Sequence, residues 1–594
     1  MKWNIPLSSW KFFALLFCLG LGTGFSLFFF SSQSITYDGP LYSSGLQSKS
    51  FFDDVYQTVK QESFNQVKAA SVVVAHHLLV ADQIARTFES ISSYPKTIII
   101  LSPNHFSSGT AQVQFSQGAW QTPYGEVFAD AEAVATLVSY LSFTAIEETT
   151  FEKEHGIAAL VPFIKKSFPK AQIVPIALAS SLDKTKQQQI ATALADLFPN
   201  ALVIASVDMS HELPESVAFF HDQITQSVLE AGGCDQCRLE VDCQPALNIL
   251  LAINALKGTQ TWHLLHRGSS IEMGVTENPL ENTSHILGYF TKGKPTHEQA
   301  SPSLFFVGDI MLDRYVEQLM QWKGVNYPFK NMQRFLLGTN LTIGNLEGTI
   351  GEQAQTEEDL ASLHFVFPPS VTTPLASFFT TLGLANNHTD DFGQDGYEST
   401  LSLLTESGID SFGSSNAPDP VFETTIEETH LVFIGYHAFG MDAQTVVDRI
   451  QEYSTEGNPF IIVFAHWGEE YLSHPTDQQR EDARRFVNAG ADLIVGHHPH
   501  VIQGMEMIEN TPVIYSLGNF IFDQIEPATN EGLALGLLFT ESHYQLSFFP
   551  FEIVQAQPTP LSGTKEQELQ KRFASLSQED LSERIIQNNL IISY

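Results

Sequence analysis

Basic side chains are scarce in this chain of 594 residues. It has 30 Lys and Arg against 67 Asp and Glu, a formal net charge of −37 at pH 7. A surface that binds nucleic acid needs clusters of lysine and arginine to neutralise phosphates, so the composition argues against nucleic acid as a partner. It does not exclude an anionic substrate, because metal ions bound in a cleft dominate the local field.

Cysteine is also rare, with four residues in the whole chain. Cys234 and Cys237 lie in the stretch GGCDQCRLEVDC, where they predict a small disulfide loop formed in an oxidising compartment. A metal clip is the less favoured alternative, because the chain has no second pair of closely spaced cysteines. Cys243 would remain free in either case.

One long hydrophobic run stands at the start of the chain. Phe12 to Phe30 carries no charge, and Lys2 and Lys11 precede it. This pattern predicts a positive-inside start with the rest of the chain exported, and the run is about long enough to span a bilayer. No clear A-x-A cleavage site follows. We therefore expect residues 1–34 to be a signal anchor, with a cleaved signal peptide as the alternative. The anchor would be a single N-terminal hydrophobic helix in the cell membrane, with both domains extracytoplasmic.

The first half predicts an α/β domain over residues 50–291. Strands are expected at Ser71–Ala75, Thr97–Leu101, Gln172–Leu178 and Ala201–Val207. Helices are expected at Val80–Ser90, Ala131–Leu141, Ile157–Ser167, Lys184–Phe198 and Ser216–Ala231. Such alternation indicates a mainly parallel sheet covered by helices.

A polar stretch with two prolines, residues 292–303, predicts a linker to a second α/β domain over residues 304–560. One helix of that domain is well marked: Thr476 and Gln479 make a capping box, and Gly490 ends the helix. Residues 561–594 are predicted to be a polar C-terminal tail with a helical tendency around Glu566–Leu576. The chain is too long for a single core, so two or more domains are expected in any case.

Metal-ligand residue types stand at the ends of apolar runs in the second half. They are Asp309, Glu347, Asn387, His466, His498 and His500. Most of these runs are strand-like in length and rich in β-branched residues, and loops at strand ends are where an α/β scaffold displays catalytic groups. Acid oxygens, an amide and several imidazoles suit two divalent metals that share a carboxylate. A lone His-x-His is weak, but five such loops in one order predict a dimetal site.

The motifs around these residues are VGDIML, GNLEGTI, LANNHTDDFGQDGYESTL, FAHWGEEY, AGADLIVGHHPHVIQGME and IYSLGNFIFD. They resemble the CapA (poly-γ-glutamate capsule protein) family, a branch of the calcineurin-like metallophosphoesterase superfamily, from about Leu304 to Gln524. The resemblance implies an αββα metallophosphoesterase-like sandwich with two divalent metals (Mn, Zn or Fe) at the sheet edge. Glu347 would bridge the two metals, and His388 would be the catalytic group that donates a proton or stabilises the oxyanion.

The resemblance assigns Asp309 and His500 to the first metal, and Asn387, His466 and His498 to the second. One departure concerns the first metal: the superfamily usually has a histidine two residues after the first aspartate, where this chain has Met311. A thioether is a poor ligand for a hard divalent metal. His497 is a spare imidazole, for which a supporting hydrogen bond is the expected role.

The first half resembles the MEMO family, also called AmmeMemoRadiSam system protein B, which shares its fold with the class III extradiol dioxygenases. The matching pieces are VVVAHHL, IIILSPNHFSSG, TPYGEV, EHGIAALVPFIK, IVPIAL, ASVDMSHEL, DCQPAL and HILGYF. The resemblance implies that His76, His105 and Cys243 bind one iron or copper ion. Asp208 and His211 would be catalytic acid–base or hydrogen-bonding groups.

The same resemblance implies that Glu154 and His155 line this cleft. The family's usual Pro-His-Ala-Gly turn is replaced by Ala-His-His-Leu, so His77 is an alternative ligand to His76. Cys243 has an alternative fate as well, a disulfide with Cys234 or Cys237. The domain would then be a scaffold that binds a ligand without redox turnover.

Together these features favour an exported, membrane-anchored protein whose second domain is a dimetal hydrolase or assembly factor. Its partner would be an anionic cell-surface polymer or its precursor, of the poly-γ-glutamate or capsule type, and capsule-synthesis membrane proteins are further candidate partners. Two dissimilar alternatives remain open. One is a non-catalytic protein that binds and assembles a surface polymer. The other is a redox metalloenzyme centred on the first domain.

Overall fold

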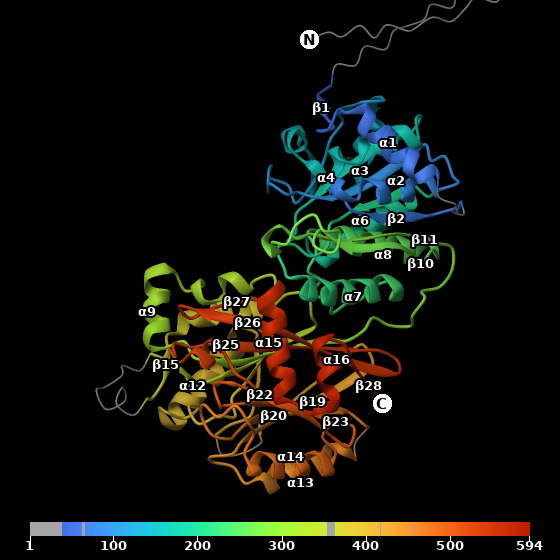
Figure 1. Cartoon of the computed structure of the whole chain (residues 1–594). Helices are drawn as coiled ribbons and strands as arrows, with labels where there is room; N and C mark the ends of the chain where they lie inside the picture. The colour runs from blue at the N-terminus through green and yellow to red at the C-terminus, as the bar shows by residue number, and fades with distance from the viewer. Residues whose placement is uncertain (1–38, 62–65, 353–362, 416, 418, 456) are drawn as a thin grey trace, which may run out of the picture.

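The computed structural model describes residues 39–61, 66–352 and 363–594, apart from residues 416, 418 and 456. The hydrophobic helix expected within residues 1–34 lies outside the described residues. None of the helices in the described part of the chain has the length and apolar character that a membrane crossing requires. The described chain is a mixed α/β protein, and Figure 1 shows a first domain at the top and a second domain below it.

The first domain is built on an eight-stranded sheet. In spatial order its strands are β10 (Thr261–Ser269), β11 (Ser284–Thr291), β2 (Ser71–Val74), β9 (Leu202–Ser206), β3 (Thr97–Pro103), β8 (Gln172–Leu178), β4 (Val113–Phe115) and β7 (Thr144–Ile146). The central strands β2, β9, β3 and β8 pair in parallel, as the sequence predicts. A smaller sheet contains β1 (Leu41–Ser43), β5 (Ala119–Thr122) and β6 (Gly125–Phe128).

Helices cover both faces of the large sheet, which is why its central strands are apolar along most of their length. In β3, Ile98 and Ile100 pack on one side and Ile99 and Leu101 on the other. The first side is covered by α1 (Lys49–Lys60), α2 (Ala81–Glu89), α4 (His155–Ala158) and α5 (Val161–Ser167). The second is covered by α3 (Ala131–Tyr140), α6 (Lys184–Leu197), α7 (Glu215–Ala231) and α8 (Gln244–Lys257).

Several helices of the first domain differ from the sequence prediction, including α1, which was not predicted. The single helix expected over Ile157–Ser167 is two helices, α4 and α5, and Pro162 lies in the first turn of α5. A proline lacks the amide proton that a continuous helix would use there, but it suits a helix start. The helix α8 was not predicted; Pro245 lies at its start, and Gly258 ends it in the left-handed conformation.

Two sheets form the second domain. The nine-stranded sheet contains β17 (Asp410–Phe412), β16 (Thr381–Gly383), β13 (Leu341–Leu346), β12 (Ser303–Ile310), β25 (Glu531–Phe539), β26 (His543–Val554) and β27 (Gln557–Pro560), with β24 (Asn519–Ile521) beside β12 and β28 (Leu590–Ser593) beside β26. The six-stranded sheet contains β18 (Phe422–Ile426), β19 (Thr429–His437), β20 (Phe460–His466), β21 (Leu493–His497), β23 (Thr511–Leu517) and β22 (Ile502–Ile508). The short strands β14 (Thr349–Ile350) and β15 (Val366–Phe367) pair separately.

The two sheets of the second domain pack face to face. Alternate residues of β12 point to opposite sides: Leu304 and Phe306 join the core between the sheets, whereas Phe305 and Val307 face the helices outside. The outer helices on that side include α9 (Arg314–Lys323), α11 (Thr372–Phe378) and α12 (Gly393–Glu406). The far face of the six-stranded sheet is covered by α13 (Ala443–Ser454) and α14 (Asp477–Ala489), and α14 has the predicted capping box.

Residues after Pro560 form part of this fold, which differs from the polar tail expected. Here α15 (Gly563–Leu576) and α16 (Ser582–Ile586) pack on the domain, and β28 pairs with β26. The helix α15 buries Leu569 and Phe573, which are four residues apart and therefore share one face. Its other residues are mostly polar, which is why the sequence alone reads as a tail.

An aromatic cluster joins the two domains. Phe220 on α7 of the first domain lies with its ring centroid 6.0 Å from Phe305 and 5.4 Å from Phe549, both in the second. Phe335 packs on Phe305 at 5.0 Å, edge to face. All four rings are buried, and Figure 1 shows α7 at the boundary between the domains. The domains therefore share a continuous apolar core.

Candidate metal centres

The six predicted ligands of the second domain come together at one end of its two sheets. Asp309 lies near the end of β12, Glu347 follows β13, and Asn387 follows β16. From the other sheet, His466 ends β20, and His498 and His500 follow β21. The parallel pairing of β12, β13 and β16, and of β20 and β21, places their carboxyl ends together. This end of an α/β sheet is the usual place for a ligand site.

A close approach of two backbones positions Asp309. A Cβ added to Gly308 would lie 1.8 Å from the carbonyl oxygen of Gly518, so only glycine fits there. This approach lets Asp309 pair in register with Asn519 of β24. Asp309 Oδ1 also accepts a hydrogen bond of 2.8 Å from the Asn345 side chain, which fixes the carboxylate.

Glu347 is the clearest sign that this place suits a cation. Its side chain is fully buried, and neither carboxylate oxygen has a hydrogen-bond partner among the described residues. Unpaired buried carboxylates are costly, so they occur paired or on metals. Glu347 shares a group with Asp309 and His466 in which one ligand atom from each lies within 4.8 Å of the others. These residues fit a metal, and a carboxylate there suits the predicted bridge.

Three of the predicted ligands meet at His466. Its Nε2 lies 2.6 Å from Asn387 Oδ1 and 3.1 Å from His498 Nδ1. On the opposite side of the ring, the Asn345 side-chain nitrogen lies 3.2 Å from Nδ1. Asn345 therefore links the imidazole to Asp309, in the way that supporting hydrogen bonds orient metal ligands. Asn345 lies within the GNLEG motif, but this supporting role was not predicted from the sequence.

The histidines after β21 have an uncommon backbone. His498 has φ of 95° and His500 has φ of 57°, both in the left-handed region that side chains rarely adopt. Such conformations cluster at functional sites. His500 Nδ1 lies 2.9 Å from Asn519 Oδ1, which leaves Nε2 facing Glu347 Oε1 at 3.8 Å. His497 packs inward, with Nε2 3.3 Å from the carbonyl of Val307, so it has the supporting position expected.

His388 lies beside the cluster. Its Nδ1 is 2.9 Å from Asp391 Oδ2, and its Nε2 is 3.9 Å from Glu347 Oε1. A carboxylate can only accept here, so Asp391 holds the proton on Nδ1 and turns Nε2 toward the centre. The ring of Phe365 lies against it at 4.2 Å. The imidazole of His388 is therefore directed toward Glu347.

Met311 offers no ligand to the first metal. Its side chain is fully buried, and its Sδ accepts a hydrogen bond of 3.1 Å from the backbone amide of Asp313. Met311 therefore does not belong to the group of potential metal ligands that contains Asp309.

Burial dominates the electrostatics of this centre. It raises the pKa of Glu347 to about 7, although the nearby His500 opposes the shift. It lowers the pKa of His498 to about 3 and that of His466 far below its usual value, with the neighbouring imidazoles adding to both effects. Burial alone would also lower the pKa of His500, but Glu347 and Asp309 raise it to about 9. The centre is thus rich in neutral imidazole, the form that binds metals.

The first domain brings its predicted residues together at the carboxyl ends of β2, β3 and β9. His76 follows β2, with Nε2 3.4 Å from Asp208 Oδ2 and 3.3 Å from Asp242 Oδ2. The His105 ring centroid lies 4.9 Å from that of His76, and its Nε2 is 3.6 Å from Asp242 Oδ2. His76, Asp208 and Asp242 form one group able to hold a metal, and His76, His105 and His155 form another.

Asp242 is a candidate metal ligand that was not predicted from the sequence. It directly precedes Cys243, the predicted ligand, and one of its oxygens, Oδ1, is buried without a hydrogen-bond partner among the described residues. Cys243 is a free, buried cysteine that belongs to neither group of potential ligands in the described chain. Burial raises its pKa well above the usual range of a thiol, with the charge of Asp242 as the next cause. His76, Asp208 and Asp242 fit a metal with one imidazole and two carboxylates, and His105 Nε2, 3.6 Å from Asp242 Oδ2, offers a further imidazole at the same place.

The remaining predicted residues of this cleft lie around the same cluster. Glu154 Oε1 lies 2.6 Å from His105 Nδ1, and the His155 ring stacks on His105 at 3.8 Å. Burial alone would lower the pKa of His105, but the hydrogen bonds that its imidazole donates to Asp242 and Glu154 raise it to about 9. His211 is half-buried, and its Nδ1 has no hydrogen-bond partner among the described residues. His77 stands apart from His76 and packs against His285, with centroids 5.6 Å apart.

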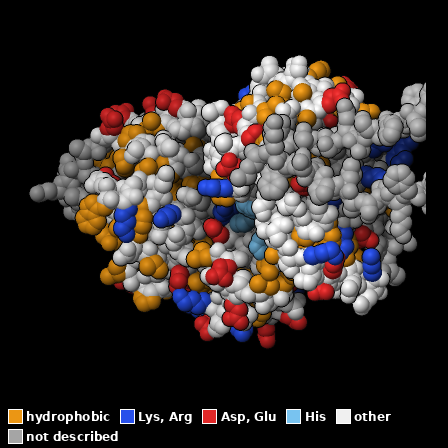
Figure 2. Space-filling view, turned by 90° about the horizontal axis from the view of Figure 1, so that it is seen from above, with side chains coloured by type: hydrophobic (Ala, Val, Ile, Leu, Met, Phe, Trp, Pro, Cys, Tyr) orange, Lys and Arg blue, Asp and Glu red, His pale blue; other side chains and the backbone are white. Residues whose placement is uncertain are grey.

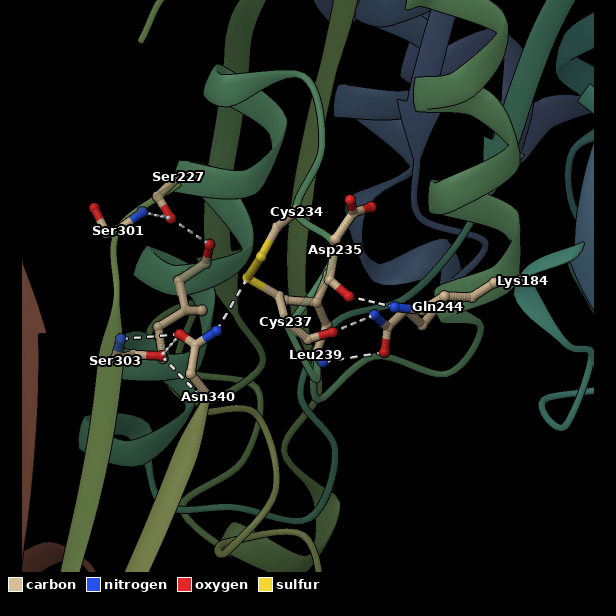
Figure 3. The surroundings of a disulfide bond; sticks show 11 residues. Lys184, Ser227, Cys234, Asp235, Cys237, Leu239, Gln244, Ser301, Ser303 and Asn340 are labelled. Carbon is tan, nitrogen blue, oxygen red and sulfur yellow. Dashed lines mark hydrogen bonds between the residues drawn. A yellow bond between two sulfur atoms is a disulfide. The ribbon is translucent and has the colours of Figure 1, made fainter. Parts of the chain in front are cut away.

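Cys234 and Cys237 form the predicted disulfide, so Cys243 does not pair with either of them. Figure 3 shows the loop that the disulfide closes. The side chain of Asn340, in the second domain, lies 3.6 Å from Cys237 Sγ. Gln244 accepts a hydrogen bond from the Leu239 amide and donates one to the Cys237 carbonyl. The disulfide thus fixes the segment that leads to Asp242.

The two halves of the chain match different known families. Residues 303–524 match the family described as bacterial capsule synthesis protein PGA_cap, and residues 36–232 match the family described as Memo-like protein. The second half is similar to CapA proteins, and the first to MEMO1 family proteins. This agrees with the two resemblances seen in the motifs.

Three relatives illustrate the extent of the similarity. The PGA biosynthesis protein CapA of Bacillus subtilis (strain 168) is 29% identical over 280 residues, 44% of this chain and 73% of that protein. The capsule biosynthesis protein CapA of Bacillus anthracis is 28% identical over 291 residues, 45% of this chain and 71% of that protein. A MEMO1 family protein of Caldivirga maquilingensis is 30% identical over 162 residues, 26% of this chain and 57% of that protein. The second domain is therefore related to capsule-synthesis proteins.

Proposed function

We propose that the second domain is a dimetal hydrolase that acts on an extracytoplasmic anionic polymer of the poly-γ-glutamate or capsule type. The observation that carries this proposal is Glu347, a fully buried carboxylate with no hydrogen-bond partner among the described residues. It stands between Asp309 and His500 of one half-site and His466 of the other. A pair of divalent ions held there would supply an activated water and stabilise the developing oxyanion.

The chain's own residues contribute the rest of the chemistry. Asp391 holds the Nδ1 proton of His388, and Nε2 of His388 faces Glu347. His388 is therefore in position to give a proton to a leaving group or to stabilise an oxyanion at this end of the sheets. Asn345 and Asn519 hold the imidazoles of His466 and His500 in orientation. Such an arrangement serves phosphoester or amide hydrolysis.

We also propose that the protein is exported and anchored in the cell membrane by residues 12–30, with both domains extracytoplasmic. The uncharged run of that segment supports this. The Cys234–Cys237 disulfide supports it independently, because disulfides persist in oxidising compartments. Capsule-synthesis membrane proteins are then suitable partners.

The test is hydrolysis of a γ-linked glutamate polymer by the full chain. We expect chain shortening that depends on added Mn²⁺ or Zn²⁺ and is lost in Glu347→Ala. If the polymer is bound but never shortened under any metal, the domain is an assembly protein. The position of Met311, which takes a ligand away from the first metal, is the observation that favours that second candidate.

A redox role for the first domain is the third candidate. Its support is the cluster of His76, His105 and Asp242, since two imidazoles and a carboxylate with open positions suit iron. Cys243 is a free cysteine and does not form a disulfide. Binding of one iron or copper ion that depends on His76 and His105 would support this role.

A further inference from the structure

A cavity of about 570 Å³ opens beside the cluster of the first domain. Its walls include His105, His211 and Asp242, together with the polar loop from Ser107 to Gln112. Figure 2 shows histidine side chains at the bottom of a hollow near the middle of one face of the protein, with basic and acidic side chains around it. One wall residue, Arg334, comes from the second domain.

The contact between the domains fixes Arg334 in place. The next residue, Phe335, is buried in the aromatic cluster formed with Phe220, Phe305 and Phe549. Four residues after Arg334, Gly338 has φ of 87°, and a Cβ there would lie 2.9 Å from the His221 ring of the first domain. The backbone of this segment therefore lies tightly against the first domain and has little freedom to move away.

Two carboxylates of the first domain orient the guanidinium. Arg334 Nη1 donates to the buried Glu240 Oε1 at 3.0 Å, and Nε lies 3.6 Å from Glu212 Oε2. Nη2 has no partner among the described residues, and the side chain is 43% exposed. Arg334 thus lines the cavity with part of its guanidinium unpaired, and the planar fork of an arginine is the geometry that recognises a carboxylate or phosphate.

We propose that Arg334 is a specificity-determining residue for the first domain's cavity and binds the carboxylate of an anionic ligand there. The first domain's site is then complete only with the second domain in place. This inference rests on the proposed function in one respect: the ligand class, a carboxylate-bearing unit, is that of the polymer proposed for the second domain. Both sites would then handle the same kind of molecule.

The experiment measures binding of γ-linked diglutamate to the full chain by calorimetry. It is done in the Glu347→Ala variant, so that the second domain's centre does not contribute. We expect Arg334→Gln to weaken binding about tenfold or more, the effect of losing one charge-assisted hydrogen-bonding group, and Arg334→Lys to restore part of it. Arg449→Gln is the matched control. Arg449, on the distant helix α13, also pairs with two carboxylates, those of Asp419 and Glu452.

The possible results separate this proposal from the proposed hydrolase. Equal binding by Arg334→Gln and Arg449→Gln would overturn the role of Arg334, and so would a lack of binding in the Glu347→Ala background. Neither result touches the dimetal site, which is judged separately by metal content and polymer hydrolysis. A loss of first-domain metal in Arg334→Gln as large as its loss of diglutamate binding would also overturn the proposal. The residue would then act on the metal cluster rather than on the ligand.

Discussion

His500 Nε2 lies 3.8 Å from Glu347 Oε1, and no described residue donates a hydrogen bond to that carboxylate. Burial raises the pKa of Glu347 to about 7, while the carboxylates around His500 raise its pKa to about 9 against the effect of burial. Two neighbouring groups whose raised pKa values keep protons bound near neutral pH form a site where a metal ion is expected to displace those protons.

Metal affinity of the second domain should fall as the pH falls. A metal must displace the His500 proton below pH 9 and also the Glu347 proton below pH 7, so affinity drops about tenfold per unit between pH 9 and 7 and more steeply below. His466 and His498 add little, since their pKa values lie far lower. Calorimetric titration with Mn²⁺ at pH 6, 7 and 8 measures this. An affinity independent of pH over that range would contradict the assignment.

His388→Ala should lower turnover far more than metal content. A lost proton donor costs about 10²–10⁴-fold in rate, whereas the ligands remain. The measurement is kcat on a chromogenic phosphoester alongside elemental analysis. Asp391→Asn, which changes the partner of His388 Nδ1 and of the Phe365 backbone amide, should give a smaller loss. If His388→Ala loses its metal and its activity in equal proportion, His388 is a ligand.

Asp242→Asn should remove the metal of the first domain, and Cys243→Ala should leave most of it. The reason is position: Asp242 Oδ2 lies 3.3 Å from His76 Nε2 and 3.6 Å from His105 Nε2, whereas Cys243 belongs to no described metal-compatible group. Iron or copper content of the two variants decides between them. The reverse order would restore Cys243 as the ligand that the motif resemblance implies.

Phe220→Ala should destabilise both domains together. Its ring, on α7, is buried against Phe305 and Phe549. Removing a buried phenylalanine lowers the free energy of unfolding by about 3–5 kcal/mol. Phe219→Ala is the control, because that neighbouring side chain is 40% exposed. Thermal unfolding followed by circular dichroism should show one transition moved to lower temperature. Two transitions, with only one of them moved, would mean that the domains unfold independently.

The sequence predicts the central strands of the first domain well, and the six candidate ligands that it predicts for the second domain lie together at one end of that domain's sheets. Runs such as Thr97–Leu101 are apolar because both faces of the sheet are covered, and a strand end followed by Asp or His places a ligand at a shared edge. The similarity of residues 303–524 and 36–232 to two known families confirms the predicted resemblance of each half to a different family.

Other features depend on contacts between distant segments and leave no local pattern. Asp242 differs from Cys243 by one position, and only the fold shows which of them faces His76. Arg334 enters the first domain's cavity from the other domain, so no motif of the first half could reveal it. The polar surface of α15 conceals the buried pair Leu569 and Phe573, and for that reason residues 561–594 read as a tail.

The most direct test of the dimetal centre is the metal content of the full chain by elemental analysis, wild type beside Glu347→Ala. We predict about two divalent ions in the second domain of the wild type and their loss in Glu347→Ala, with an unchanged circular dichroism spectrum, because Glu347 lies at a strand end. Glu317→Ala, a partly buried glutamate on α9, is the control and should keep both ions. No bound metal after reconstitution, or full metal in Glu347→Ala, would contradict the account.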